Sequence, residues 1–375
     1  MRFVHIGDLH LGKVIYQFSL LNIQRELLFE LLEYMNQEDI RTLVIAGDVY
    51  DRSIPSQEAV NLLDEFLSQA LLDYHIEVFM ISGNHDSSDR MHFASSILSS
   101  KGLHIETYLK ESMTYVQKDD IRFYLLPFFK PSQVKDLFQD YDINTYQDAM
   151  NEYLKHQHFD KKFKNILITH QFVGSSSLTC ESEVPLSVGG SEIIDASLFD
   201  DFDYVALGHL HSPQKVSRET IRYSGSIMPY SFDEVKQDKS IVIIDTDNMS
   251  VHFHRLHPSL TLQKYKGTFE QFMDPYYIEK KDDFLSLELE NKTLIPHAID
   301  QLRILYPHIL QITYAHLSYQ NDRQFVQPME SLKEMNMTEL FCTFYKDVKN
   351  IELTSQQKRI VHKLLEKVGD SYENY

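Results

Sequence analysis

Cysteine is scarce in this chain: Cys180 and Cys342 are the only two among 375 residues. So few cysteines cannot form the disulfide framework that holds many small secreted domains together. Because disulfides are rare in reducing compartments, the composition is typical of a cytoplasmic protein, and we expect that location. Both thiols are predicted to be buried or chemically idle.

Long apolar runs are missing as well. No stretch approaches the roughly 20 consecutive apolar residues that span a bilayer. The N-terminal MRFVHIGDLH predicts a strand rather than a signal peptide, so we expect no membrane association. Hydrophobic residues still make up 43% of the chain, which is enough for a sizeable globular core, and the length suggests two or three domains.

Basic residues are outnumbered, with 36 Lys and Arg against 55 Asp and Glu, and the formal net charge is −19. Proteins that bind nucleic acid usually carry a basic surface, so the chain alone should bind DNA weakly. Net charge does not describe a local groove, and divalent cations would neutralise nearby carboxylates. If DNA is the substrate, we expect a more basic partner to supply affinity.

The chain does have an alternation of short apolar runs with longer amphipathic segments, which predicts an α/β domain over residues 1–257. One helix is predicted over 23–35, and a second begins after Ser56 as its N-cap. Strands are predicted over 2–6, 43–46, 76–81, 122–126, 165–169, 204–207, 239–246 and 251–256. Beyond residue 258, strands at 284–289 and 309–314 and a helix at 297–305 predict a small α+β unit.

Five polar clusters follow the predicted strands. They are Asp8-Leu9-His10, Gly47-Asp48, Gly83-Asn84-His85-Asp86, Thr169-His170 and Gly208-His209-Leu210-His211. A lone Asp or His at a strand end is usually a turn former or a satisfied core residue. Loops at the carboxyl ends of α/β strands converge, however, so these donors should meet at one edge. Imidazole and carboxylate donors without thiolate fit Mn²⁺, Fe²⁺ or Zn²⁺ better than Ca²⁺.

The donor types predict a pair of cations. Two divalent ions about 3.5–4 Å apart can clamp a phosphate and stabilise its attacking and leaving oxygens. Asp48 is the predicted bridging carboxylate. The Asp8-Leu9-His10 and His209-Leu210-His211 spacings would point both polar side chains to one side of an extended backbone. Asn84 would add a carbonyl oxygen and His170 an imidazole.

Two residues are predicted to act on the substrate rather than to bind metal. His85 would face the substrate, stabilising the transition state or protonating the leaving oxygen. Asp86 would orient His85 and favour its protonated form. Both are therefore the predicted catalytic residues.

The clusters resemble the calcineurin-like metallophosphoesterase superfamily, whose pattern is D-x-H, G-D, G-N-H-D/E, a lone H and G-H-x-H. Longer stretches are similar to the SbcD-type nuclease subunits of bacterial SbcCD complexes. These stretches are HIGDLHLGK, AGDVYDRSIPS, ISGNHDSSDR, SEVPLSVGGSEIIDASLF, ALGHLHSPQ and YSGSIMPYSFDE. The likeness extends over nearly the whole chain, and no ligand of the family pattern is missing.

The resemblance implies an architecture and a ligand set. It implies a two-sheet sandwich flanked by helices (1–257), a small α+β capping domain (258–326) and a helical C-terminal segment (327–375). The last would dock on an ATPase partner, although its apolar stripe could instead pack on its own domain. Two Mn²⁺, or Mg²⁺ or another divalent cation, would be bound. One ion would take Asp8, His10, Asp48 and His211, and the other Asp48, Asn84, His170 and His209.

The resemblance also implies an activity. It is Mn²⁺-dependent, ATP-stimulated 3′→5′ exonuclease action on double-stranded DNA, with endonuclease action on single strands and hairpins. These reactions would serve DNA repair, recombination and replication. The implied partner is an SbcC-type coiled-coil ATPase, with this chain as a homodimer within a heterotetramer.

Other functions stay open. A protein phosphatase or small-molecule phosphodiesterase can use the same scaffold, but protein phosphatases usually read Gly-Asn-His-Glu after Gly-Asp-x-x-Asp-Arg-Gly. Here Asp86 stands where that pattern has Glu, and Ser53 stands where it has the last Gly. A non-catalytic scaffold protein on this fold would usually have lost a ligand. The segment 223–232 is either a loop that contacts substrate or a plain turn.

Overall fold

The computed structural model describes residues 1–139, 142–174 and 193–315, together with 345, 353–354, 356–358 and 361. Both cysteines and nearly all of the predicted segment 327–375 lie outside these residues. Contacts divide the chain into two compact units. One comprises Met1–Lys264, Lys280–Ser286 and Tyr306–Leu310, and the other comprises Tyr265–Glu279, Leu287–Leu305 and Gln311–Tyr375.

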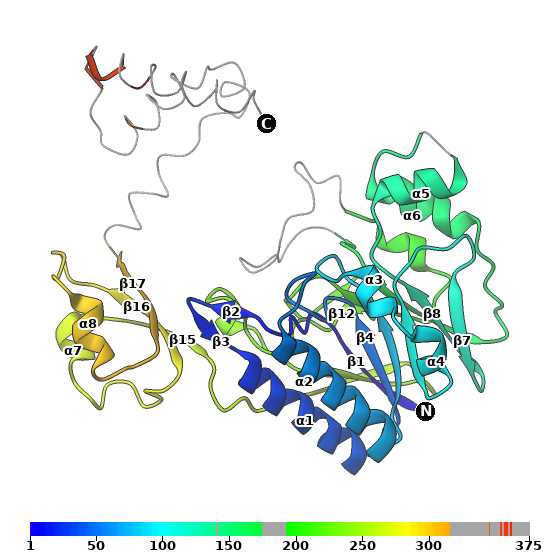
Figure 1. Ribbon diagram of the computed structural model, residues 1–375, viewed down its shortest axis with the longest axis horizontal. Helices are drawn as coiled ribbons and strands as arrows, with labels where there is room; N and C mark the ends of the chain where they lie inside the picture. Colours follow the sequence, from blue (N-terminus) through cyan, green and yellow to red (C-terminus); the bar gives the residue numbers. More distant parts are fainter. Residues whose placement is uncertain are drawn as a thin grey trace. The chain divides into compact units, whose positions relative to one another are not determined.

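The first unit contains two six-stranded sheets (Figure 1). In order, the first sheet holds β14 (Ser250–His254), β13 (Ile241–Asp245), β1 (Arg2–Ile6), β4 (Thr42–Ala46), β5 (Glu77–Ile81) and β6 (Leu103–Glu106). The second holds β11 (Gln214–Val216), β12 (Arg218–Tyr223), β10 (Tyr204–Gly208), β9 (Lys164–His170), β8 (Ile121–Leu126) and β7 (Thr114–Lys118). The central strands of both sheets are parallel. Antiparallel strands complete the β14 edge of the first sheet and both edges of the second, whereas the β6 edge of the first sheet is parallel.

Large apolar side chains fill the space between the sheets. Phe79 of the first sheet stacks on Phe123 of the second, with ring centroids 4.4 Å apart, and Phe3 meets Phe123 edge-on at 5.6 Å. All three rings are fully buried. Burying a ring of this size stabilises a fold by roughly 1.5–3 kcal/mol relative to leaving it exposed. Central strands such as β4 and β10 are buried on both faces because helices cover their outer sides.

Helices α1 (Leu21–Gln37) and α2 (Gln57–Ser68) lie side by side and pack against the first sheet (Figure 1). The predicted N-cap is confirmed, since the Ser56 hydroxyl accepts the Ala59 N–H at 3.2 Å. Helices α5 (Pro131–Phe138) and α6 (Tyr146–Lys155) pack against the second sheet. Short elements complete the unit: β2 (Val14–Ile15), β3 (Phe18–Ser19), η1 (Gln69–Asp73), α3 (Ser88–His92), α4 (Ser95–Ser99), η2 (Ala196–Phe199) and η3 (Glu234–Lys236).

A small three-stranded sheet follows in the chain, in the order β15 (Leu262–Gly267), β16 (Phe284–Leu289) and β17 (Ile309–Tyr314). Two short helices, α7 (Phe269–Phe272) and α8 (Ala298–Arg303), occur between these strands. The predicted α+β character of this region is confirmed, whereas the boundary at residue 258 stays a prediction. Among the described residues, no helix is long and apolar enough to cross a membrane.

Candidate metal centre

The seven predicted ligands share one location, immediately after the carboxyl ends of parallel strands in both sheets. They are Asp8 and His10 after β1, Asp48 after β4, Asn84 after β5, His170 at the end of β9, and His209 and His211 after β10. Asn84 is half-buried and the other six are buried. A network of contacts shorter than 4 Å connects them.

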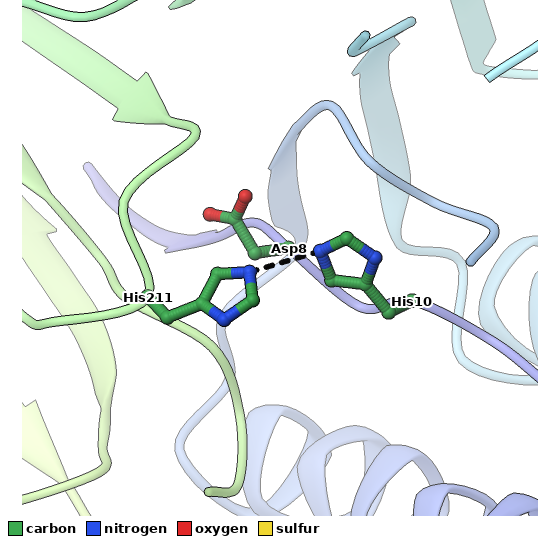
Figure 2. Close-up of side chains that lie close together, drawn as sticks. All are labelled: Asp8, His10 and His211. Carbon is green, nitrogen blue, oxygen red and sulfur yellow. Dashed lines mark hydrogen bonds between the residues drawn. The ribbon is translucent and has the colours of Figure 1, made fainter. Parts of the chain in front are cut away.

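The first group of donors is Asp8, His10 and His211 (Figure 2). Their ligand atoms all lie within 4.8 Å of one another, and Nε2 of His10 lies 3.0 Å from Nε2 of His211. Two neutral imidazole lone pairs repel at this distance unless a proton or a cation lies between them. Bonds of about 2.1 Å that meet near 90° at one metal ion would place two nitrogens about 3 Å apart. The donors therefore fit a cation.

The second group lies on the other side of Asp48. The Nε2 atom of His170 lies 3.4 Å from Asp48 Oδ2 and 3.0 Å from Asn84 Oδ1. Asn84 Oδ1 in turn lies 3.2 Å from His209 Nδ1. Asp48 Oδ2 is also 3.6 Å from Nε2 of His10, so a single carboxylate oxygen lies close to both groups.

The histidine rings are oriented by contacts behind them. His170 Nδ1–H donates to the Ala46 carbonyl at 2.8 Å, which leaves Nε2 as the ring nitrogen that faces Asp48 and Asn84. His211 Nδ1 lies 3.4 Å from a carboxylate oxygen of Glu234. Metal-binding histidines in general use the second ring nitrogen in this way, which fixes the tautomer and the ring orientation.

Burial and close charges perturb the acid–base behaviour of the cluster. Burial acts to raise the pKa of Asp48, but His170 and His10 outweigh it and hold the pKa well below its usual value. Burial acts to lower the pKa of His170, but the Asp48 carboxylate outweighs it and raises the pKa to about 9. Burial and the charge of His170 lower the pKa of His209 to about 3. Such perturbed groups, gathered in one place, are typical of functional sites.

The backbone at the centre is strained. Asp8, His10 and Asp48 have φ angles of 52°, 45° and 48°, and His209 has 109°. Residues other than glycine cost about 1–3 kcal/mol each in this region, and such strain clusters at functional sites. The predicted extended backbone of Asp8-Leu9-His10 is therefore wrong. Left-handed turns converge the side chains instead, and the Asp8 and His10 amides donate to the carbonyls of Gly47 and Asp48 at 3.1 and 3.0 Å.

Glycine is required where these loops approach one another. A Cβ atom added at Gly208 would lie 1.9 Å from the Ala46 carbonyl oxygen, and one at Gly83 would lie 2.2 Å from Asp48 Oδ1. Both distances are far below van der Waals contact. Gly208 therefore allows the second sheet to approach the first, and Gly83 allows the loop after β5 to approach the loop after β4.

His85 lies beside the ligands. Its Nε2 atom is 4.0 Å from Asp48 Oδ2, and its ring meets that of His10 edge-on, with centroids 4.8 Å apart. The Nδ1–H donates to the backbone carbonyl of Asp51 at 2.9 Å. The side chain is 18% exposed. This orientation leaves Nε2 as the nitrogen nearest the centre.

The contacts of Asp86 differ from the prediction that this side chain orients His85. Its carboxylate accepts the backbone N–H groups of Val49, Tyr50 and Gly83 at 3.1, 2.9 and 2.9 Å. The side chain turns toward the loop amides, and the backbone of Asp51 takes the orienting contact with His85. Burial and the charge of Asp48 raise the pKa of Asp86 to about 6. Asp86 thus ties the loop after β4 to the loop after β5.

Sequence reasoning did not single out Asp51 or Glu234. Asp51 forms a further donor group with His10 and His85, and its carboxylate accepts from Lys13 Nζ at 2.9 Å. Its signal was its place in AGDVYD, three residues after Asp48. Burial acts to raise the pKa of Glu234, but His211 and Lys239 outweigh it and lower the pKa. Its only signal was the end of YSGSIMPYSFDE.

The segment 223–232 is mostly buried, which argues against the prediction that it contacts substrate. Nine of its ten residues are buried, and the Tyr230 ring packs edge-on against both His10 and His211, with centroids 5.6 Å apart in each pair. The Tyr230 hydroxyl donates to the Leu9 carbonyl and accepts from Gln24 Nε2. The segment therefore supports the ligands from behind.

Comparison with known proteins is consistent with this geometry. The family model for calcineurin-like phosphoesterases matches residues 1–213. The chain belongs to the calcineurin-like phosphoesterase family. This confirms the predicted family and, with the two sheets, the predicted fold class. A second model, described as the type 5 capsule protein repressor C-terminal domain, matches residues 259–349.

Two curated relatives of this phosphoesterase are named as SbcD subunits of the nuclease SbcCD. The protein from Staphylococcus epidermidis is 33% identical over 376 residues, covering 99% of each chain. The protein from Staphylococcus saprophyticus is 31% identical and covers 97% of this chain and 98% of the relative. The predicted similarity to SbcD proteins is thereby confirmed. A dimetal phosphatase structure from Danio rerio aligns at 12% identity with a TM-score of 0.33, covering 60% of this chain and 86% of that one.

Proposed function

We propose that this phosphoesterase is the nuclease subunit of an SbcCD-type complex and hydrolyses DNA phosphodiester bonds with two divalent cations, Mn²⁺ first among them. Similarity over almost the full length to two SbcD proteins of the nuclease SbcCD supports the substrate. One observation carries the two-cation chemistry. Asp48 Oδ2 lies 3.6 Å from Nε2 of His10 and 3.4 Å from Nε2 of His170, where a bridging oxygen belongs.

The proposed ligand sets follow the two groups of donors. Asp8, His10, Asp48 and His211 would hold one cation, and Asp48, Asn84, His170 and His209 would hold the other. Bound cations would supply the positive charge that stabilises the attacking and leaving oxygens of the phosphodiester. Asp48 is the only member of both sets, so its loss should disable both.

His85 is the proposed catalytic residue. With Nδ1–H donated to the Asp51 carbonyl, a proton on Nε2 would be available to the phosphoryl oxygens or to the leaving oxygen. Because a backbone carbonyl carries no charge, it fixes the ring without competing for the phosphate. Asp86, through the three loop amides that it holds, would keep His85 and Asp48 in register.

The finer features of the proposal concern the assembly. Residues 258–326 would form a capping domain that directs DNA, and residues 327–375 would dock on an SbcC-type coiled-coil ATPase. The complex would act as a heterotetramer in the cytoplasm, in DNA repair and recombination. It would trim double strands from 3′ ends and open single strands and hairpins. The net charge of −19 supports dependence on the partner for DNA affinity.

The test is cleavage of end-labelled duplex DNA by metal-stripped protein, alone and with its co-expressed ATPase, before and after Mn²⁺ is restored. Asp48→Ala runs in parallel, with the exposed Asp64→Ala as its matched control. We expect Mn²⁺-dependent trimming from 3′ ends that Asp48→Ala abolishes and Asp64→Ala retains. Hydrolysis of a generic phosphodiester but never of DNA would favour the small-molecule phosphodiesterase. Inactivity on both would favour a scaffold protein.

A further inference from the structure

A buried ion pair lies directly behind the first group of ligands. Glu234 Oε2 accepts from Lys239 Nζ at 2.6 Å, and Glu234 Oε1 lies 3.4 Å from His211 Nδ1. The side chain of Glu234 is 0% exposed, and that of Lys239 is 8% exposed. Glu234 begins η3, shortly after the buried segment 223–232 that supports the ligands, and Lys239 follows η3.

The same pair holds His211 at a second point. Lys239 Nζ donates to the His211 backbone carbonyl at 2.7 Å and contacts Ser226 Oγ at 2.8 Å. The Ser226 N–H also donates to that carbonyl, at 3.1 Å. The ring and the backbone of His211 are thus both fixed by one compact polar cluster.

Stability alone does not account for this cluster. Removing two charges from water costs free energy, and replacing a buried ion pair with apolar residues of similar volume is often neutral or stabilising. The carboxylate instead has a chemical use. A negative charge at Nδ1 favours the Nδ1–H tautomer and makes Nε2 more basic, and Nε2 is the atom that lies 3.0 Å from His10 Nε2.

The second group of ligands differs from the first at His170. His170 Nδ1 donates to the uncharged Ala46 carbonyl at 2.8 Å, whereas His211 Nδ1 faces a carboxylate. The two predicted cation positions are therefore supported unequally. We propose that Glu234, paired with Lys239, is a positioning residue that strengthens His211 as a donor and selectively sets the cation affinity of the His10–His211 position. This inference rests on the two-cation site proposed above.

The test is Mn²⁺ binding to the full metal-stripped chain, without DNA. Glu234→Gln keeps the shape and a hydrogen-bond acceptor but removes the charge. We expect two ions per wild-type chain by calorimetry, and in the variant one of the two affinities 10- to 100-fold weaker with the other unchanged. At a Mn²⁺ concentration that fills both wild-type positions but only one in the variant, electron paramagnetic resonance should show a spin-coupled pair in the wild type and isolated Mn²⁺ in the variant.

Glu106→Gln is the matched control. Glu106 is also buried, with Lys110 Nζ at 2.6 Å and the Thr114 hydroxyl at 2.6 Å, but it contacts none of the predicted ligands. This variant should bind both ions as the wild type does. If Glu234→Gln leaves an unpaired ammonium that prevents folding, the double variant Glu234→Gln/Lys239→Met removes that charge and should show the same selective loss.

The outcomes separate this inference from the proposed function. Fewer than two ions on the wild-type chain would overturn the two-cation site itself. If the wild type binds two ions and Glu234→Gln binds both with the affinities of the wild type, only the role of Glu234 would be overturned. Equal weakening at both positions, or failure of both variants to fold, would assign the carboxylate to the fold and also overturn it.

Discussion

Individual side chains at the centre have separable roles, and His85 shows this most clearly. Its backbone N–H donates to Asp48 Oδ1 at 2.9 Å, while its ring is held by the Asp51 carbonyl. A change of side chain therefore leaves the contact with the proposed bridging carboxylate intact. The proposed catalytic role therefore depends on the His85 ring, whereas the contact with Asp48 depends on the His85 amide.

We therefore expect His85→Gln to lose turnover but not metal. General acid–base groups typically contribute 10²- to 10⁴-fold, so cleavage should slow by about that factor. Mn²⁺ affinity should stay within about twofold of the wild type, because no predicted ligand is touched. Single-turnover cleavage and Mn²⁺ calorimetry measure the two quantities, with the exposed His158→Gln as control. Loss of a bound ion in His85→Gln would instead make His85 a ligand.

At the scale of the elements, Asp86 joins two loops that belong to different strands. Its carboxylate accepts three backbone N–H groups, from the loops after β4 and β5. A buried donor that loses its partner costs about 1–3 kcal/mol. The loops carry Asp48 and Asn84, so the position of both ligands depends on this one side chain.

Asp86→Ala should accordingly destabilise the metal-free protein by several kcal/mol, and Asp86→Asn should restore part of the loss. Urea unfolding of the metal-free protein gives the free energies. The Mn²⁺ affinity of Asp86→Ala should also fall, because the loops after β4 and β5 are no longer connected by this carboxylate. The role predicted from the sequence gives a different result. If Asp86 acted on His85, Asp86→Asn would shift the pH–rate profile and leave the unfolding free energy unchanged.

The sequence predicts the mostly apolar strands well and the more polar strands poorly. Strand β1 was predicted at its observed bounds, and so were β16 and β17, because each is short and mostly apolar. Strands β7 and β15 were not predicted. They carry alternating or polar residues such as TYVQK and LQKYKG, and their stability comes from neighbouring strands rather than from their own pattern.

The features of the candidate site also differ in how far the sequence predicts them. Its ligand residues can be predicted from motifs and from strand ends, because each is recognised within a short stretch of sequence. The backbone turns at Asp8 and His10 are not local, because they depend on how the loop after β1 meets the loop after β4. The contact of Glu234 with His211 is not local either, because it depends on how the segment after β12 meets the loop after β10. No spacing in the sequence shows that residue 234 lies behind residue 211.

At the scale of the whole unit, one buried histidine makes the folding of the two sheets sensitive to pH. His5 on β1 is fully buried, and its Nδ1 lies 3.0 Å from the hydroxyl of Tyr204 on β10, across the interior of the sandwich. Burial, followed by the charge of Arg222, lowers the pKa of His5 from 6.5 to about 3. The folded protein therefore keeps this ring neutral at pH values where the unfolded chain protonates it.

The sign of the effect follows from proton uptake. Between pH 6.5 and about 3 the unfolded chain binds the extra proton, so the free energy of unfolding must fall as the pH falls through that range. Between pH 7.5 and pH 5.5, this one group lowers the free energy of unfolding by about 1.4 kcal/mol. Above pH 6.5 the contribution is fully present.

We expect His5→Asn to remove that contribution, because the amide can still bond the Tyr204 hydroxyl but does not titrate. Urea unfolding of the metal-free wild type and variant at pH 7.5 and 5.5 provides the comparison. The stability advantage of the wild type over the variant should shrink by about 1.4 kcal/mol at the lower pH. The exposed His75→Asn should leave the pH dependence of the wild type in place. Parallel pH dependences in wild type and His5→Asn would show that His5 is protonated in the folded sandwich, and its environment would then have to stabilise a buried charge.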